Sequence, residues 1–188
     1  MDPLPGFNEL QDEEKSGIFL TVESFSLSPS REHLAVAGLN SVVVLNVADG
    51  RVLCAAETSE PVEGLVWSPE GTHLVATGGT ERQIISGANY SLVLEAETLK
   101  EVGSFPEAAG VSFNKQGDRL LVVGTSAEIE VWSWPDRKLM LSIPPQQSVH
   151  HATPAGWFGP IRLAWLPGDT GVLLDGGPGY FDCFSTTE

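Results

Sequence analysis

Few residues in this sequence have the types and spacing that catalysis or metal binding requires. His150 and His151 form the only histidine pair, and no cysteine or carboxylate stands near them to complete a metal site. Cys54 and Cys183 stand inside apolar segments, where a free cysteine behaves as a small buried hydrophobe. A phosphate-cradling glycine loop, a nucleophile elbow and a His-Glu-x-x-His motif are all missing from the sequence. We therefore expect no enzymatic activity, no metal and no cofactor.

Aromatic residues are better candidates, for binding rather than for chemistry. The segment 144–160, PPQQSVHHATPAGWFGP, is long for a connection between strands, and such segments are often functional or disordered. Trp157 and Phe158 stand there between glycine and proline, and exposed aromatics anchor many protein–protein contacts. The predicted protein-binding residues are Trp157, Phe158, His150 and His151. The alternative is that the aromatic pair packs beneath the strands that follow.

The rest of the chain consists of repeated elements that would position these residues. A strand, a polar turn and a second strand ending in glycine occur four times, about 40–50 residues apart. The copies are SFSLSPSREHLAVAG from Ser24, GLVWSPEGTHLVATG from Gly64, GVSFNKQGDRLLVVG from Gly110 and RLAWLPGDTGVLLDG from Arg162. Large apolar side chains two residues apart share one face of a strand. A third strand follows every copy and a fourth follows the first three, which predicts an all-β fold built of propeller blades.

The pattern W-S-P-x-G … L-x-x-x-G … V-W-S resembles the WD40 repeat, over residues 22–185. This resemblance implies a β-propeller of about four units, either incomplete or small. The Trp-Asp dipeptide of the family is replaced by Leu45-Asn46, Leu94-Glu95, Trp132-Ser133 and Cys183-Phe184, and the Gly-His dipeptide is missing. We therefore expect divergent blades without the family's His–Asp network. The tryptophans expected to pack between blades are Trp67, Trp132, Trp134 and Trp165.

The repeats predict the organisation of the chain. An acidic tail, residues 1–17, is expected to be disordered and to precede blades that fill residues 18–188. The predicted blades are about 22–60, 61–106, 107–143 and 160–188, with the long 144–160 loop before the last. Because the fourth copy ends after its third strand, two interpretations stay open. In the first, residues 17–22, GIFLTV, supply the missing outer strand and close a ring of four blades. In the second, the chain is a truncated or open arc whose exposed blade faces invite association.

Charge narrows the classes of partner. The chain has 25 acidic and 10 basic residues and a net charge of −15, which repels nucleic acid and anionic lipid. We therefore expect protein partners, with a basic surface as the natural complement, and no nucleic acid or membrane. The acidic N-terminus lacks the features of a signal peptide and no segment has the apolar length of a membrane span. A cytoplasmic protein is expected, with the nucleus as the alternative.

The resemblance to WD40 repeats implies a function in binding. The first hypothesis is a non-catalytic protein–protein interaction scaffold built on WD40-like blades, which is a subunit of a larger complex. Self-association, or completion of the propeller by another subunit, is compatible with it. The alternative is a regulator of a small GTPase, because VSFNKQGDRLLVVG and IEVWSWPDRKLML are similar to blades of WD40-like nucleotide-exchange factors.

Overall fold

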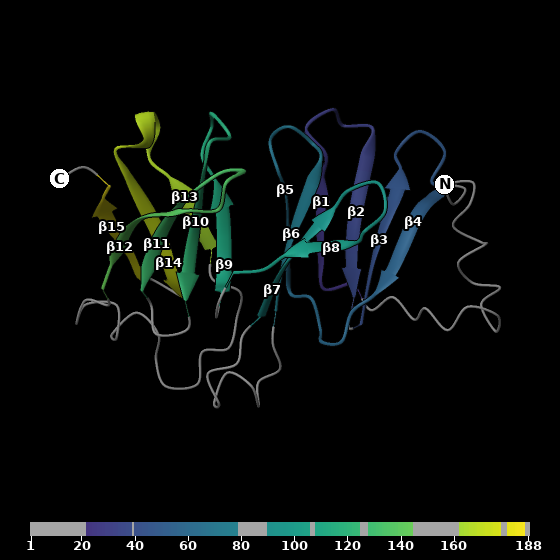
Figure 1. The fold of residues 1–188 in the computed structure, drawn as a ribbon, viewed down its shortest axis with the longest axis horizontal. Coiled ribbons are helices and arrows are strands. Elements are labelled where there is room, and N and C mark those ends of the chain that lie inside the picture. The colour runs from purple at the N-terminus through teal and green to yellow at the C-terminus, as the bar shows by residue number, and fades with distance from the viewer. Residues whose placement is uncertain are drawn as a thin grey trace. The chain divides into compact units, whose positions relative to one another are not determined.

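The computed structural model describes residues 22–38, 40–78, 90–105, 108–124, 128–144, 162–177 and 180–186. These residues form four antiparallel sheets, and in each sheet the strands are neighbours in the order of the chain (Figure 1). The described residues fall into two compact units. The first extends to Ala76 and includes Leu92–Gly103, and the second combines Thr77–Ser91 with the chain from Ser104 onward.

The first unit contains the first sheet and most of the second. The first sheet consists of β1 (Ser24–Leu27), β2 (His33–Gly38), β3 (Ser41–Asn46) and β4 (Val52–Glu57). The second consists of β5 (Gly64–Trp67), β6 (His73–Gly78), β7 (Tyr90–Glu95) and β8 (Glu101–Gly103). The dividing line between the units crosses β6 and β7.

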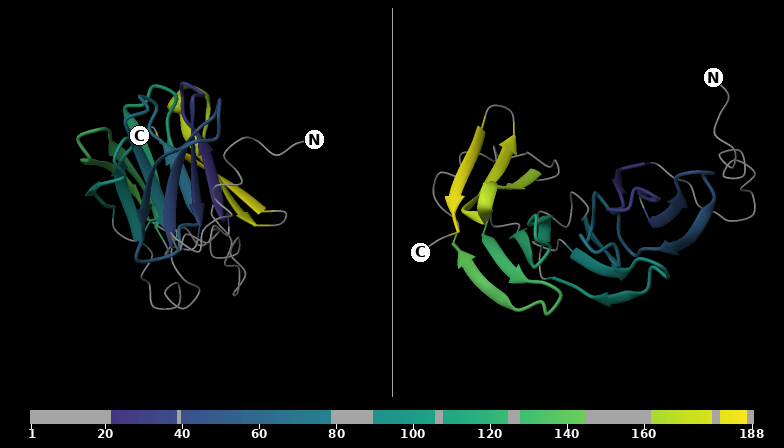
Figure 2. Two further views of the ribbon diagram at one scale, coloured as in Figure 1. Left: turned by 90° about the vertical axis from the view of Figure 1, so that its right-hand side faces the viewer. Right: turned by 90° about the horizontal axis from the view of Figure 1, so that it is seen from above.

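The second unit contains the third and fourth sheets. The third consists of β9 (Ala108–Phe113), β10 (Arg119–Gly124), β11 (Ile129–Ser133) and β12 (Leu139–Ile143). The fourth has three described strands, β13 (Arg162–Trp165), β14 (Gly171–Gly177) and β15 (Tyr180–Ser185). Figure 2 shows the strands of each sheet side by side as a meander. The predicted all-β fold of about four blade units is confirmed.

A side-chain cap closes the turn between the first two strands in three of the sheets. The Oγ of Ser28 accepts a hydrogen bond from the backbone N–H five residues on, as does the Oγ of Ser68, and Asn114 Oδ1 does the same. Serine and asparagine favour turns because their short side chains satisfy nearby backbone groups. In the fourth sheet Leu166 stands at this position without an acceptor, and the turn is instead a short 3₁₀ helix, η1 (Pro167–Asp169).

In the first three sheets, the second strand is buried on both of its faces over most of its length. In β10, Leu120 and Leu121 point to opposite faces of the sheet, and both are fully buried. This burial explains why these strands are continuous apolar runs rather than alternating ones. Among the described residues, no helix is long and apolar enough to span a membrane.

The register of the fourth sheet corrects one part of the sequence alignment. Val172 pairs with Phe184, as Leu120 pairs with Trp132 in the third sheet. Phe184, and not Cys183, therefore corresponds to Trp132. Cys183 lies on the opposite face, because successive residues of a strand point to opposite sides.

Candidate protein-interaction surface

The four residues predicted to bind partners lie outside the described part of the chain. They are His150, His151, Trp157 and Phe158, in the 144–160 segment. Their role stays a prediction. The same holds for the ring-closing strand proposed at residues 17–22, of which only Val22 is described.

Within the first unit, a tryptophan joins the first two sheets. Trp67 Nε1, on β5, donates a 2.8 Å hydrogen bond to the backbone oxygen of Ser26 on β1. The Cys54 thiol on β4 approaches the backbone oxygen of Ala96 at 3.6 Å, which gives a second contact between the two sheets. Trp67 itself is only 6% exposed. The sheets therefore pack face to face, as predicted for blades.

The second unit repeats this contact with different residues. Trp165 Nε1, on β13, donates a 3.0 Å hydrogen bond to the backbone oxygen of Ser112 on β9. Around it lies an apolar core, whose third-sheet members are Leu121, Val123, Ile129 and Val131 and whose fourth-sheet members are Val172, Leu174 and Phe184. Packing between blades is thus confirmed for Trp67 and Trp165.

The other two tryptophans have different surroundings. Trp132 donates from Nε1 to Glu130 Oε2 on its own strand at 3.0 Å and meets the Phe105 ring edge to face. Trp134 lies in the turn that follows β11 rather than on a strand, and its ring packs edge to face on Phe113 at a centroid distance of 5.0 Å. Both tryptophans have aromatic partners, which accounts for their position by packing.

These contacts define two faces of a blade. The leading face carries the second and fourth residues of the first strand, which are Leu163 and Trp165 in the fourth sheet. The trailing face carries the residue between those two positions of the repeat, which is Ser112, between Val111 and Phe113, in the third sheet. In both units the leading face of one blade packs on the trailing face of the blade before it. The contact is therefore directional.

The leading face of the first sheet is exposed on its first strand. Phe25 is 70% exposed and Leu27 is 46% exposed, whereas the corresponding Leu65 and Trp67 of the second sheet are 5% and 6% exposed. Val22, just before β1, is also exposed. Large apolar side chains that are exposed together on one strand are typical of surfaces that bind another protein. The sequence held a signal for this site, since the first copy has leucine where the second and fourth have tryptophan.

The trailing face of the fourth sheet is exposed as well. Ala164 and Cys183 are exposed and Leu173, which pairs with both, is half-buried. The expectation that both cysteines are buried is therefore wrong for Cys183, because no further described sheet covers its face. Cys54 is half-buried, and this burial raises the pKa of its thiol and keeps it protonated at neutral pH.

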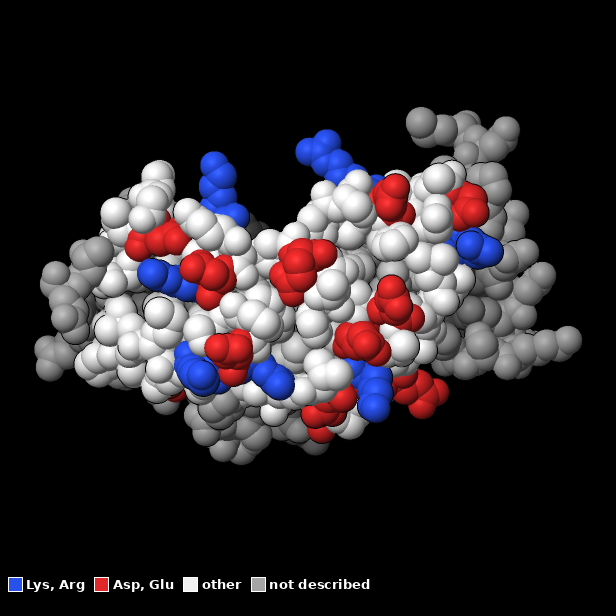
Figure 3. Space-filling view, turned by 45° about the horizontal axis from the view of Figure 1, so that its top comes forward, with Lys and Arg blue, Asp and Glu red and all other residues white. Residues whose placement is uncertain are grey.

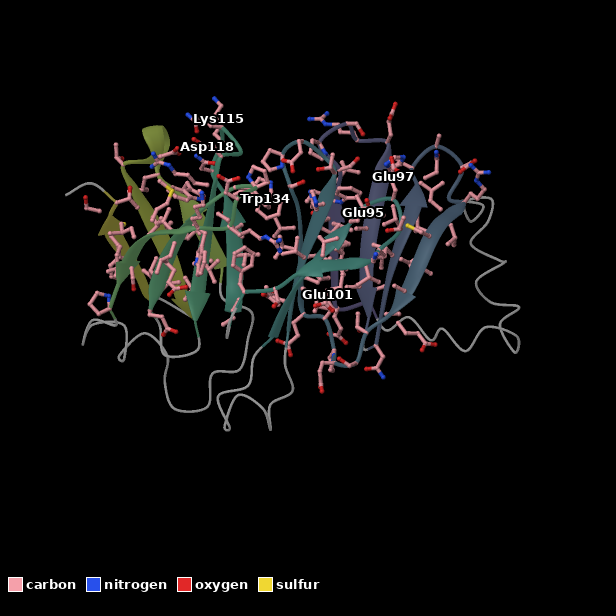
Figure 4. The ribbon with its side chains drawn as sticks, in the orientation of Figure 1. Glu95, Glu97, Glu101, Lys115, Asp118 and Trp134 are labelled. Carbon is pink, nitrogen blue, oxygen red and sulfur yellow. The ribbon has the colours of Figure 1, made fainter. Side chains whose placement is uncertain are left out.

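The turns at one end of the second unit share a buried amide. Asn114 Nδ2 donates to Asp118 Oδ1 and to Asp169 Oδ2, each at 2.7 Å, and so connects the turns of the third and fourth sheets. The backbone N–H of Trp134 donates to the backbone oxygen of Asp118 at 2.8 Å. Figure 4 shows Lys115, Asp118 and Trp134 at this end. These hydrogen bonds explain the grouping of Asn114, Asp118 and Asp169 by a structural role, which is to connect the turns of the third and fourth sheets.

Acidic side chains also mark the β7–β8 hairpin of the first unit. Glu95, Glu97 and Glu101 are exposed there, and Glu95 Oε2 accepts a 2.6 Å hydrogen bond from Thr98. Figure 4 labels the three carboxylates, and Figure 3 shows acidic side chains interspersed with fewer basic ones over the face that it draws. Within the described residues, no three or more His, Cys, Asp or Glu side chains are grouped so that they could hold a metal ion.

The sheets and their directional packing define a class of fold, the WD40-like β-propeller repeat. Two solved structures support this assignment, the structure of U3-55K and the crystal structure of the RRP9 WD40 repeats. Each aligns with a TM-score of 0.62 at 16% sequence identity and covers 90% of this chain. The alignment covers 53% and 52% of those chains, so this chain spans about half their length. The protein therefore has a WD40-like repeat fold.

No family model matches the sequence. No curated protein matches it either. The likeness is thus one of fold, and it leaves the function to be argued from the surface.

Proposed function

We propose that this protein is a non-catalytic protein–protein interaction scaffold built on WD40-like blades and a subunit of a larger assembly. The observation that carries the proposal is the exposed leading face of the first sheet. Phe25 and Leu27 are exposed there, although the corresponding residues of the second sheet are buried by packing on another blade. A face that is used for packing elsewhere in the chain is open to a partner here.

Charge determines the partners that suit the rest of the surface. The chain carries a net charge of −15, and part of it is concentrated on one hairpin in the exposed carboxylates of Glu95, Glu97 and Glu101. Complementary charge speeds association and excludes partners of like charge. Basic proteins are therefore the expected partners, and nucleic acid and anionic membranes are not.

Purification of the tagged chain from its own cells tests the scaffold. We expect at least one other protein in stoichiometric amount, released progressively as salt is raised. The triple variant Glu95→Lys, Glu97→Lys, Glu101→Lys should lose most of it. A control charge reversal, Asp136→Lys on the exposed β11–β12 turn, should retain it. Recovery of the chain without any stoichiometric protein, at low and high salt, contradicts the scaffold function.

A further inference from the structure

The exposed leading face extends across the whole first blade. Leu27 pairs with Leu34, Leu34 with Leu45 and Leu45 with Val52, so one apolar row crosses all four strands. Its two ends are exposed and its middle members are half-buried. Val36, beside Phe25, is buried, so the open apolar area is concentrated on β1 and along this row.

The corresponding row of the fourth blade is covered. Trp165 pairs with Val172 and Val172 with Phe184, and the last two are buried against the third blade. The row of the first blade thus has the same position and apolar character as a row that packs on a neighbouring blade. The two rows differ in burial, because the described residues include no blade that packs on the leading face of the first blade.

The fourth blade offers the complementary face. Ala164, Leu173 and Cys183 form one row on its trailing side, and two of the three are exposed. The same side of the third blade presents Leu121 and Val131, both buried under the fourth blade. Small and medium apolar side chains at these positions accept the large side chains of a leading face.

We propose that two copies of this chain associate head to tail, with the leading face of the first blade of one copy on the trailing face of the fourth blade of the other. The proposal rests on the proposed function, since it assigns the exposed leading face to a particular partner. By the register of the observed contacts, Leu27 of one copy lies opposite Ala164 of the second copy, as Trp165 lies opposite Ser112.

A second copy is the partner that the observations favour. Both halves of the contact are exposed among the described residues of one chain, so a second copy can supply the complement of each. A contact between two different faces forms a ring where the rotation closes. Two copies supply twice the four described sheets, within the range of about 4–8 blades found in propellers. One chain also spans about half of the WD40 chains that it resembles.

Sedimentation velocity over a concentration series tests the association with the full chain. We expect a species with twice the 20.1 kDa mass of one chain, favoured as concentration rises. Phe25→Asp should shift it to the mass of a single chain. Met140→Asp is the matched control, because Met140 is 54% exposed on β12 and belongs to neither face; it should leave the double mass unchanged. Circular dichroism of each variant verifies folding.

A mixing experiment tests the head-to-tail arrangement. Phe25→Asp damages the leading face and keeps the trailing one, and Ala164→Asp does the reverse. Each variant alone should sediment as a single chain. An equimolar mixture should restore the double mass, because one intact leading face then meets one intact trailing face. A mixture that stays at the single mass overturns the arrangement.

A variant that is expected to strengthen the association tests the proposal without relying on a loss of association, which misfolding could also cause. Leu27→Trp places at the first blade the donor that Trp67 and Trp165 provide in theirs. One new hydrogen bond at each of the two contacts, with added apolar contact, should lower the dissociation constant of the pair by roughly tenfold or more. An unchanged dissociation constant overturns the assigned register.

The failure of the proposed scaffold function can be distinguished from the failure of self-association. A wild-type chain that stays at the single mass at all concentrations, yet retains its stoichiometric cellular partner, overturns self-association and supports the scaffold. Doubling of the mass together with no other protein in the cellular purification supports self-association and contradicts the larger assembly.

Discussion

Trp67 donates its indole N–H to the backbone oxygen of Ser26 over 2.8 Å, and this bond joins the first two blades of the chain. The second unit has the same bond between Trp165 and Ser112. Because one geometry occurs in both units, the contact is a property of the repeat.

Replacing Trp67 with phenylalanine keeps an aromatic ring and removes the donor. The Ser26 carbonyl then loses its partner and the smaller ring leaves space, so the free energy of unfolding should fall by about 1–3 kcal/mol. Urea denaturation followed by circular dichroism measures the loss. Trp132→Phe is the control, because the Trp132 N–H bonds only to Glu130 on the same strand. An equal loss in both variants would show that the bond between blades is not the cause.

Arg31→Gly should stabilise the protein. Arg31 occupies the left-handed region with φ 64°, at the turn position where the second and third blades have Gly71 at 78° and Gly117 at 80°. A residue with a Cβ is strained there by roughly 1–2 kcal/mol, and glycine is not. We expect a gain of about 0.5–1 kcal/mol after the larger chain entropy of unfolded glycine is subtracted. Thermal unfolding gives the value, and Gly71→Ala should change it in the opposite direction.

Asn114→Asp should destabilise the joint between the third and fourth blades. The amide is 2% exposed and donates to Asp118 and Asp169, and a carboxylate in its place repels both. The loss of the buried bonds should lower the free energy of unfolding by about 2–3 kcal/mol at neutral pH. The deficit should shrink as pH falls, because protonation of one carboxyl removes the repulsion. A deficit that is constant with pH would mean that charge plays no part.

The two cysteines should react at different rates. Burial raises the pKa of Cys54, so at neutral pH its reactive thiolate fraction is smaller than that of an unburied thiol, and the side chain is also less accessible. Cys183 is exposed. Labelling with a thiol reagent in dilute solution should show a fast phase that Cys183→Ser abolishes and a slow phase that Cys54→Ser abolishes. The slow phase should accelerate as pH rises, since the thiolate is the nucleophile. A single phase of equal reactivity would contradict the difference in burial.

The blades were predictable because their signals are local. The paired apolar residues and the capped turn around Ser68 repeat along the sequence, so the strands and hairpins follow from short segments. The caps of Ser28 and Asn114 have the same origin. The comparison with WD40 structures confirms the fold that these signals indicated.

The open-arc alternative predicted exposed blade faces, but the repeat pattern alone does not say which side chains are exposed on them. Phe25 and Leu65 stand at the same place in their repeats, and one is exposed while the other is buried. Burial depends on which blade stands next to each, and a repeat pattern does not contain that information. Cys183 was placed in the interior for the same reason. The predicted binding residues Trp157 and Phe158 stay untested, because they lie outside the described residues.

The capped turns have a consequence for how this surface can diversify. The Oγ of Ser68 satisfies its own hairpin, so the turn needs nothing from the neighbouring sheets to keep its shape. Residues at the tips of such turns can therefore change identity while the tryptophan contacts below stay constant. In such a repeat, the residues that contact a partner differ from the residues that hold the fold together. Substitutions in the turn of one blade can therefore change binding specificity without changing the other blades.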